Sequence, residues 1–530
     1  MAQASVIIGS NEIIGTLWSV IEVHQALNQH WRCSITLRNT LDARPDVESL
    51  LGKPLKISTF TLENGENIIF SGTVIESRLI YEVTGSYGAI VEAFSDSWKL
   101  DQAPRHAYFK KESAQQVAST ILSNNGLALT GSVPARPEMT YVQWEETDYK
   151  FILRLVDGAE AWLRPSTDSP GLEVQTTFQA GPTIEWRQGE FGLLEWQTNG
   201  RLRSLLHTGS HYDALPMKTQ SYNDVKSDTG FYGGAAEKMV AAVKQQGANL
   251  PAASITDRNR AVTLEQYQDL LQKESRRALA SSVTCNGISR EPRVRPGDTV
   301  TISGLPEVDA SYGVIECVHR WTPQGYENHF TATPAQRWFN ADRRERPSLD
   351  GLYPARVVAN HDPHNQGRIR VQYYWQDQSE STWVRLITAH AGADRGILFL
   401  PEIGDEVAVG FEEGDVERPY ILGSLWTGVQ QPPSAGYWAA DEVNGSEFAD
   451  NNLKRIVTKS GHRITLADNP GRETITLATP KNVRITMTEK TNETGRPAIV
   501  LESKGDILFS APNGRIHFRS ATRSNETGNS

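Results

Sequence analysis

The sequence predicts a mainly β protein of several domains, and three observations carry this prediction. The chain has 530 residues, which is too many for one hydrophobic core. Its 42 Gly and 26 Pro are typical of a chain with many turns. Short runs of alternating apolar and polar residues recur along the chain, and such runs form strands with one buried face.

The first 345 residues predict two β-barrels with helices. Residues 1–165 contain alternating runs and then two helical segments, at 113–122 and 148–156. Ser113 and Gln116 form a capping box at the first of these helices. Residues 166–345 predict a second barrel with a helical insert at 264–280, where apolar residues recur at helical spacing.

Residues 351–430 predict a small closed barrel of the OB type, because five or six short strands fit into this length. OB barrels often bind nucleic acid, but this one holds 6 Lys and Arg against 11 Asp and Glu. A phosphate-binding surface requires the opposite charge, so nucleic-acid binding is disfavoured. Residues 431–450, which begin with a Pro- and Gly-containing stretch, are expected to be a linker.

Residues 451–520 contain seven short alternating runs separated by turn residues, and residues 521–530 form a polar tail. Most runs place two apolar residues two positions apart. The runs are Arg455–Thr458, His462–Leu466, Glu473–Ala478, Asn482–Met487, Pro497–Glu502, Gly505–Ser510 and Gly514–Phe518. The apolar residues expected to form the core are Ile464, Leu466, Ile475, Leu477, Val483, Ile485, Ile499, Leu501, Ile507, Phe509, Ile516 and Phe518.

Two arrangements satisfy this pattern. Each run has too little apolar area to stand alone, and a lone meander leaves its edges unpaired. The first arrangement is an ordinary antiparallel β domain. The second is an intertwined, triple-stranded β-helix, in which each chain winds around a shared axis and gives strands to three faces. Seven strands at ~4.8 Å per rung make this prism ~35 Å long.

Four stretches in a fixed order resemble the valine-glycine repeat (VgrG) spike family, which is related to fused phage baseplate-hub and tail-spike proteins. The resemblance covers nearly the whole chain. It rests on Gln143-Trp-Glu-Glu-Thr-Asp148 with Phe151 to Leu155; on Arg295-Pro-Gly-Asp298 with Tyr312 to His319 and Gly325-Tyr326; on Ala355 to Val358, Gly367 to Val371, Leu400 to Phe411 and Leu422 to Leu425; and on Ser460 to Leu466. The resemblance favours the prism over the separate β domain.

The resemblance also identifies two sets of motif residues. In the hub, residues 1–345, these are Gln143, Glu146, Asp148, Phe151 and Arg154. In the collar, the OB barrel, they are Gly367, Arg368, Pro401, Gly404, Asp405, Gly410, Gly414, Asp415 and Gly423. The resemblance implies that residues 451–520 form the needle of a spike.

The resemblance further implies a structural spike of a contractile injection system. The chain is then a homotrimer whose hub binds a hexameric tube protein and whose needle carries a small PAAR-like tip protein. Baseplate proteins and candidate effectors are further partners, with transient contact to the target membrane. The machine, whether a type VI system, an extracellular particle or a phage, stays open. The alternatives are a phage-type hub with cell-wall hydrolase activity and a fibrous adhesin.

Catalytic, cofactor and metal sites are not expected, because the sequence has no GxSxG, Walker or HExxH motif. His361 and His364 have a spacing that could hold zinc, but a second ligand pair is missing. The acidic run Glu412 to Asp415 is interpreted as an exposed turn. The N-terminus lacks a basic region before its apolar residues, so no signal peptide is expected. Synthesis in the cytoplasm is therefore expected, and the resemblance implies ejection with the tube.

The charge of the needle differs from that of the whole chain. Residues 451–520 hold 12 Lys and Arg against 6 Asp and Glu, whereas the complete chain has a net charge of −10. With the apolar residues turned inward, Arg463, Arg484, Lys504, Arg515 and Arg519 face outward. These charges either solubilise the exposed strands or favour contact with anionic membranes.

Overall fold

The computed structural model describes most of the chain, and its residues form two compact units, Met1–Leu425 and Trp426–Ser530. The described residues are 3–13, 17–40, 46–61, 65–81, 83, 87–135, 139–187, 191–213, 217–255, 264–339, 348–375, 380–433, 452–491 and 494–519. Most of the predicted linker 431–450 and the polar tail 521–530 lie outside them. None of the described helices is long and apolar enough to cross a membrane.

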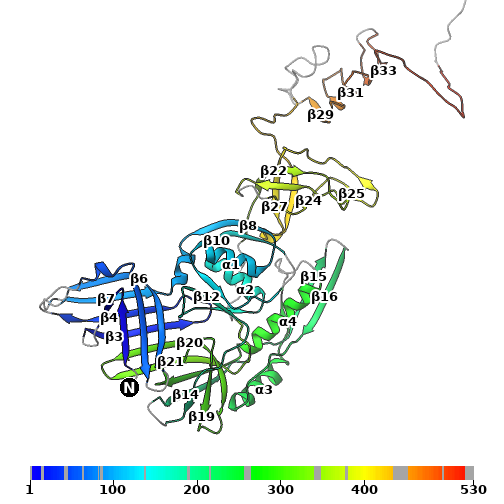
Figure 1. Ribbon diagram of the computed structural model, residues 1–530. Helices are drawn as coiled ribbons and strands as arrows, with labels where there is room; N and C mark the ends of the chain where they lie inside the picture. The colour runs from blue at the N-terminus through cyan, green and yellow to red at the C-terminus, as the bar shows by residue number, and fades with distance from the viewer. Residues whose placement is uncertain are drawn as a thin grey trace, which may run out of the picture. The chain divides into compact units, whose positions relative to one another are not determined.

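One 13-stranded sheet joins the two halves of the hub (Figure 1). Its main path runs β14-β18-β21-β20-β3-β4-β7-β6-β5-β1-β2, and β19 pairs with β20 and β13 beside it. The strands are β1 (Ala4–Ile8), β2 (Asn11–Glu12), β3 (Trp18–Ala26), β4 (Arg32–Thr40), β5 (Pro54–Thr61), β6 (Gly65–Tyr81), β7 (Tyr87–Phe94), β13 (Thr183–Glu185), β14 (Leu193–Gly200), β18 (Val283–Ser289), β19 (Thr299–Ser303), β20 (Ala310–Thr322) and β21 (Gly325–Thr333).

The strands of the two halves pair where β3 lies beside β20, which is about 290 residues away in sequence. Glu22 lies opposite Arg320, and its Oε1 is 3.0 Å from Arg320 Nε. The boundary expected at residues 165/166 lies in sequence between β1–β7 and β13–β21, the strands of the two halves, and the sheet is continuous across β3 and β20. Alternating side chains fill a separate core on each half, one around Trp31 and one around Tyr312.

Two helices lie in the sequence between β7 and β13, the two parts of the chain that supply the strands of this sheet. Both helices predicted in the first 165 residues form, as α1 (Ala114–Asn124) and α2 (Asp148–Gly158). The capping box is present, because Gln116 N donates to Ser113 Oγ and Ser113 N donates to Gln116 Oε1. The two helices share a core with β9 (Ala128–Thr130), β11 (Trp162–Pro165) and β12 (Gly171–Gln175).

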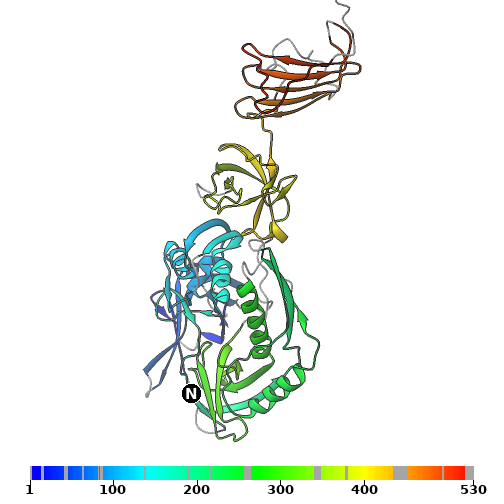
Figure 2. The ribbon, with the colours of Figure 1, turned by 90° about the vertical axis from the view of Figure 1, so that its right-hand side faces the viewer.

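The second half carries two more helices and a small sheet. α4 (Leu264–Ala280) matches the predicted helical insert, whereas α3 (Ala235–Gly247) was not expected. Tyr267 and Leu271 of α4 share a small core with Ile255, Tyr222 and Val225. Figure 2 shows α4 in green beside the hairpin of β15 (His207–Asp213) and β16 (Lys218–Val225). β17 (Ala253–Ser254) pairs with β15. Short 3-10 turns are η1 (Glu48–Leu50), η2 (Asp96–Asp101) and η3 (Glu412–Gly414).

The OB barrel has a five-stranded sheet in the order β23-β22-β27-β28-β24. Ile369 and Val384 exchange two backbone hydrogen bonds of 3.0 and 2.8 Å just before β23 and β24, which closes the sheet into a barrel. The strands are β22 (Tyr353–Ala359), β23 (Arg370–Tyr373), β24 (Arg385–Leu386), β27 (Glu406–Phe411) and β28 (Pro419–Ser424), and β25 (Ala391–Gly392) with β26 (Arg395–Gly396) forms a separate hairpin. The small closed barrel predicted from the sequence is present.

The needle region is a five-stranded antiparallel meander in the single chain. Its strands are β29 (Leu453–Val457), β30 (Arg463–Ala467), β31 (Thr474–Ala478), β32 (Arg484–Thr488) and β33 (Ala498–Glu502), each paired with its sequence neighbours. This pairing differs from the expected winding, in which successive strands of one chain lie on different faces. The turns are short enough for hairpins, so the strands of the single chain form one continuous sheet. The last two predicted runs lie within residues 503–519, none of which is in a strand.

Candidate functional site

The hub motif residues form a buried polar network at the start of α2. β10 (Met139–Thr147) leads directly into this helix and pairs with β8 (Pro104–Glu112). Gln143 Nε2 donates to Asp148 Oδ1 at 2.9 Å and to the carbonyl of Glu146 at 3.0 Å. Asp148 stands in the first turn of the helix, where a carboxylate is stabilised by the helix dipole. The network therefore fixes the angle between β10 and α2.

Arg154 continues the network one turn and a half along α2. Its guanidinium lies 2.5 Å from Glu146 Oε1, donates to the carbonyl of Val142 at 2.7 Å, and stands 5.0 Å from the centre of the Phe151 ring. A second nitrogen, Nη1, lies 3.9 Å from Glu417 Oε1 in the OB barrel. The structure thus brings all five predicted hub residues together, and Arg154 connects them to the collar.

An aromatic cluster covers the same junction between hub and collar. The Trp144 ring, from the hub, lies 4.6 Å from Trp375 and 5.5 Å from Tyr353, both in the collar, measured between ring centres. Tyr108 Oη accepts a hydrogen bond of 3.1 Å from the backbone of Thr382. These aromatic residues and Glu417 were not predicted as site residues. Trp144 lies inside the hub motif, so its position was a usable signal.

The collar motif residues occur mainly at turns. Arg368 binds Asp362 through two hydrogen bonds of 2.8 and 2.9 Å, and Asp362 also accepts from the backbone of His364 and Gln366 at 3.0 Å. The Arg368 side chain and these amides hold the pKa of the Asp362 carboxyl well below its usual range. Gly367 completes the turn with a φ of +68°, which favours glycine. Asp362 was not predicted, although it lies between His361 and His364.

The other collar motif residues shape two further turns. Gly404 N donates to the carbonyl of Val357 at 2.9 Å, and Asp405 Oδ2 accepts from Glu402 N at 2.9 Å. A Cβ at Gly414 would lie 2.0 Å from Ser348 Oγ, and the φ of +78° at this position favours glycine. The remaining members lie in or beside β27 and β28, namely Pro401, Gly410, Asp415 and Gly423. The functional role given to these residues stays a prediction.

The histidine pair and the acidic run occupy turns of the collar. His364 takes part in the Asp362 turn through its backbone, and Glu412 to Gly414 form η3. Among the described residues, no three His, Cys, Asp or Glu side chains are placed to hold a metal ion. The three cysteines, Cys33, Cys285 and Cys317, are buried, and none of them forms a disulfide.

The needle meander aligns its apolar residues into two columns on one face. In the first column Ile464 lies opposite Leu477, which is followed across the sheet by Ile485 and Leu501. In the second column Leu466 lies opposite Ile475, followed by Met487 and Ile499. Each of these side chains is at least 39% exposed in the single chain. This sheet face is apolar and uncovered within the described chain.

The predicted needle core needs two corrections. Met487 takes the place in the column that was assigned to Val483, because Asn482 adopts a φ of +59° in the turn and β32 begins only at Arg484. Ile507, Phe509, Ile516 and Phe518 lie in no strand, although the rings of Phe509 and Phe518 are 5.8 Å apart. Beyond β33 the alternating pattern therefore has no strand partner in the single chain.

The opposite face of the meander is polar. Thr465, Thr476 and Thr486 lie in register across its centre, and Arg463 and Arg484 stand at one side of this row. The two arginines therefore point away from the apolar columns, as the sequence predicted. Arg463 Nη2 donates to Asn482 Oδ1 at 3.0 Å, and Arg484 forms an ion pair with Glu502.

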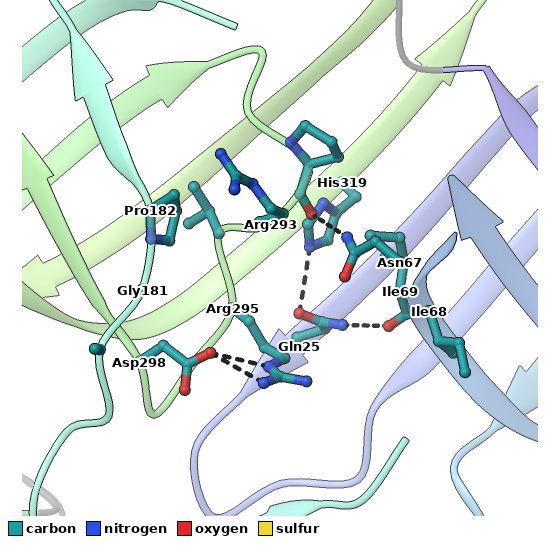
Figure 3. Close-up of a pocket in the computed structure, with 13 residues that line it drawn as sticks. Gln25, Asn67, Ile68, Ile69, Gly181, Pro182, Arg293, Arg295, Asp298 and His319 are labelled. Carbon is teal, nitrogen blue, oxygen red and sulfur yellow. Dashed lines mark hydrogen bonds and ion pairs between the residues drawn. The ribbon is translucent and has the colours of Figure 1, made fainter. Parts of the chain in front are cut away.

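A cavity of about 350 Å³ lies between the two halves of the hub (Figure 3). Gln25 Nε2 donates to the Ile69 carbonyl at 2.6 Å, and Gln25 Oε1 lies 3.3 Å from His319 Nε2. Asn67 donates to the carbonyl of Pro292 at 3.3 Å, and Arg295 binds Asp298 at 3.1 Å. The polar groups of the lining thus join β3 to β6 and β20, and β6 to the segment before β19. Burial lowers the pKa of His319 to about 3.

Comparisons with known protein families match two parts of the chain. Residues 24–325, more than half of the chain, match the phage tail baseplate hub (GPD) family. Residues 353–426 match the type VI secretion system/phage-baseplate injector OB domain. The type VI secretion system spike protein VgrG1a of Pseudomonas aeruginosa is 24% identical over 480 residues, which cover 82% of this chain and 71% of that protein. The chain spans 45% of VgrG5 from the same organism, at 24% identity over 61% of this chain.

Two solved structures share the fold. The E. coli c3393 protein is a component of the type VI secretion system with structural similarity to T4 bacteriophage tail proteins gp27 and gp5. It has a TM-score of 0.51 and 17% identity, and the match covers 79% of this chain and 99% of that one. A chain of the Francisella PdpA-VgrG complex has a TM-score of 0.58 and 7% identity, covering 94% of this chain and 79% of that one.

Proposed function

Because this chain belongs to the phage tail baseplate hub family, we propose that it forms the homotrimeric spike of a contractile injection machine. It is a structural hub-and-spike protein related to the VgrG spikes, with the hub fold and the injector OB domain in the order expected for one. The proposal concerns its oligomeric state, its partners and its route out of the cell.

The main support for the proposed trimer is the uncovered apolar face of β29 to β33. Two adjacent columns of Ile, Leu and Met side chains are costly to leave in water, since complete burial of each side chain contributes about 1.5–3 kcal/mol. A single five-stranded sheet cannot cover its own face. Three copies related by a threefold axis cover all three faces at once and form a closed prism. The hub motif and the aromatic cluster then transmit axial load from the hub to the collar.

The two ends of such a trimer suit different partners. At the hub end we propose the hexameric tube protein and the baseplate, and at the needle end a small PAAR-like tip protein. Residues 503–519 hold exposed apolar side chains beyond the last strand, which supports a further partner at that end. We propose no catalytic activity for the described units, and effectors as cargo. The related spikes belong to secretion systems, so we propose assembly in the cytoplasm and ejection with the tube.

The mass of the full-length chain in solution tests the proposal. Three copies of the 58.8 kDa chain give about 176 kDa, which sedimentation or mass photometry separates clearly from a monomer. We expect a trimer at micromolar concentration that resists dissociation by SDS. A monomer under these conditions would overturn the proposed assembly.

A further inference from the structure

Two strands of the needle share a six-residue sequence pattern. Residues 463–468 read Arg-Ile-Thr-Leu-Ala-Asp, and residues 484–489 read Arg-Ile-Thr-Met-Thr-Glu. In each case the arginine is the first residue of a strand, β30 or β32, and the acidic residue follows its last residue. The pattern thus places a positive charge where the strand begins and a negative charge where it ends.

The meander puts the two arginines on one edge of the sheet and the two acids on the other. β31 lies antiparallel between β30 and β32, so those two strands run in the same direction. The arginine and the acid of one strand are five residues apart, or about 17 Å in an extended chain. They are too far apart to form an ion pair within one copy, because an ion pair requires an N–O distance near 4 Å.

A threefold axis changes this relationship. Cyclic symmetry requires the starting edge of each sheet to meet the finishing edge of the next sheet at every corner of the prism. Identical strands of the three copies also lie at the same height. The arginine of a strand and the acid of the same strand in the next copy are therefore brought to one corner on one rung.

We propose that these residues form two rings of ion pairs between copies, an inference that rests on the trimer proposed above. In the lower ring Arg463 binds Asp468 of the next copy. In the upper ring, two rungs or about 10 Å along the axis, Arg484 binds Glu489 of the next copy. The partner at this edge is a second copy of the chain.

The rings fix the axial register of the three copies relative to one another, which the apolar columns cannot fix. Ile464, Leu477 and Ile485 recur at equivalent places on successive rungs, so a slip of one copy along the axis keeps apolar side chains in contact. A slip by two rungs, however, leaves at most one of the two rings with both charges. In the single chain Asp468 binds Lys454 at 2.7 Å and Arg484 binds Glu502, and exposed pairs of this kind are weak enough to exchange.

Cysteine cross-linking in the full-length protein tests the placement. One variant carries Arg463→Cys with Asp468→Cys, which the proposal places at the same corner and rung. The matched control carries Arg484→Cys with Asp468→Cys, whose sites lie two rungs apart and exceed the 4.4–6.8 Å between Cα atoms that a disulfide allows. The three native cysteines are buried. We expect covalently linked trimers on a denaturing gel from the first variant after mild oxidation, and uncross-linked chains from the control.

A double-mutant cycle provides a second measurement that does not depend on disulfide geometry. We expect Arg484→Gln, Glu489→Gln and the double variant to lower the melting temperature of the trimer by the same amount, because each removes the same ion pair. The proposed rings would be overturned by two results in a wild type that is still a trimer. The losses in melting temperature would be additive, and cross-links would form in the control variant alone or in neither variant. A monomeric wild type would instead overturn the proposed function on which the inference rests.

Discussion

Arg154 of α2 connects the hub to the collar, because its guanidinium lies 2.5 Å from Glu146 within the hub and 3.9 Å from Glu417 in the OB barrel. Glu146 and Arg154 are both largely buried. A buried carboxylate that loses its cation keeps the cost of desolvation without the compensating attraction. This relationship leads to the first prediction.

We predict that Arg154→Leu destabilises the first unit strongly, by about 3–5 kcal/mol, because it leaves Glu146 uncompensated. Glu417→Gln is the matched control, since it weakens only the longer contact, and it should cost about 1 kcal/mol or less. Urea denaturation followed by tryptophan fluorescence measures both. Equal losses from the two variants would contradict the assignment of Glu146 as the main partner.

A second prediction concerns the collar turn that is built around Asp362. Asp362→Asn keeps the size of the side chain but removes the charge that Arg368 and the backbone amides of His364 and Gln366 contact. Charge-assisted hydrogen bonds of this kind contribute about 1.5–3 kcal/mol, so we expect a loss of roughly 2 kcal/mol at pH 7. His364→Ala, which leaves the backbone contact intact, should cost little.

The same substitution has a defined pH dependence. The pKa of Asp362 is lowered in the folded protein, so its stabilising effect is complete above the unfolded pKa of about 3.9 and is lost as the pH falls towards the folded value. The difference between wild type and Asp362→Asn should therefore be constant from pH 7 to about pH 5 and shrink below that. Thermal melts at pH 7, 5 and 3 provide the measurement. A difference that does not change with pH would contradict this account.

The hub should lose stability in mild acid because of His319. Burial lowers its pKa to about 3 in the folded protein, against about 6.5 when unfolded, so the unfolded chain binds the proton more readily. The resulting loss begins below pH 6.5 and reaches about 2 kcal/mol at pH 5. We expect His319→Gln to reduce this pH dependence, whereas His24→Gln, at a side chain that is 52% exposed, leaves it unchanged. Denaturation curves at pH 7 and 5 compare them.

For β30 to β33 the alternating pattern of the needle predicted the face of each residue but not its strand partner. A period of two residues settles which side chains share a face, and it is the same for a winding chain and for a meander. The hairpins that decide between them depend on turns such as the one at Asn482, whose positive φ also moves the start of β32. Val483 and Met487 have the same parity, so the pattern alone could not choose between them.

The candidate sites likewise combine features that the sequence predicted with contacts that it did not. The capping box and the hub motif concern residues within about 12 positions of one another, and their spacing made them visible in the sequence. The pairing of β3 with β20 and the contact of Arg154 with Glu417 join segments more than 260 residues apart. Such contacts depend on how complete domains pack, which local patterns do not encode. Asp362 was not predicted, because the spacing of His361 and His364 indicates a metal site, whereas the structure centres the turn on the Asp362 carboxylate.

The polarity of the two needle faces predicts opposite effects for neighbouring substitutions. Met487 belongs to the apolar columns and is 40% exposed in the single chain, whereas Thr488 lies on the polar face. Met487→Asp places three carboxylates in the interior of the proposed prism, where an unpaired charge is very costly. We expect this variant to sediment as a monomer and Thr488→Asp to remain a trimer. Trimers from both variants would contradict the assignment of the apolar columns to the shared interior.

The lysines at the turns of the needle allow a test of the proposed contact with anionic membranes. Lys459 and Lys481 lie in the turns that precede β30 and β32, and Lys504 follows β33, so all three lie along the same edge of the sheet. Each lysine near an anionic bilayer is worth about 1 kcal/mol at low salt. We expect reversal of the three to Glu to lower co-sedimentation with vesicles containing phosphatidylserine at least tenfold, while the trimer persists. The control reverses Lys490 and Arg496 on the opposite edge, where Glu489 directly follows β32 and Glu473 directly precedes β31. Unchanged vesicle binding after the first reversal would mean that these lysines only keep the exposed strands soluble.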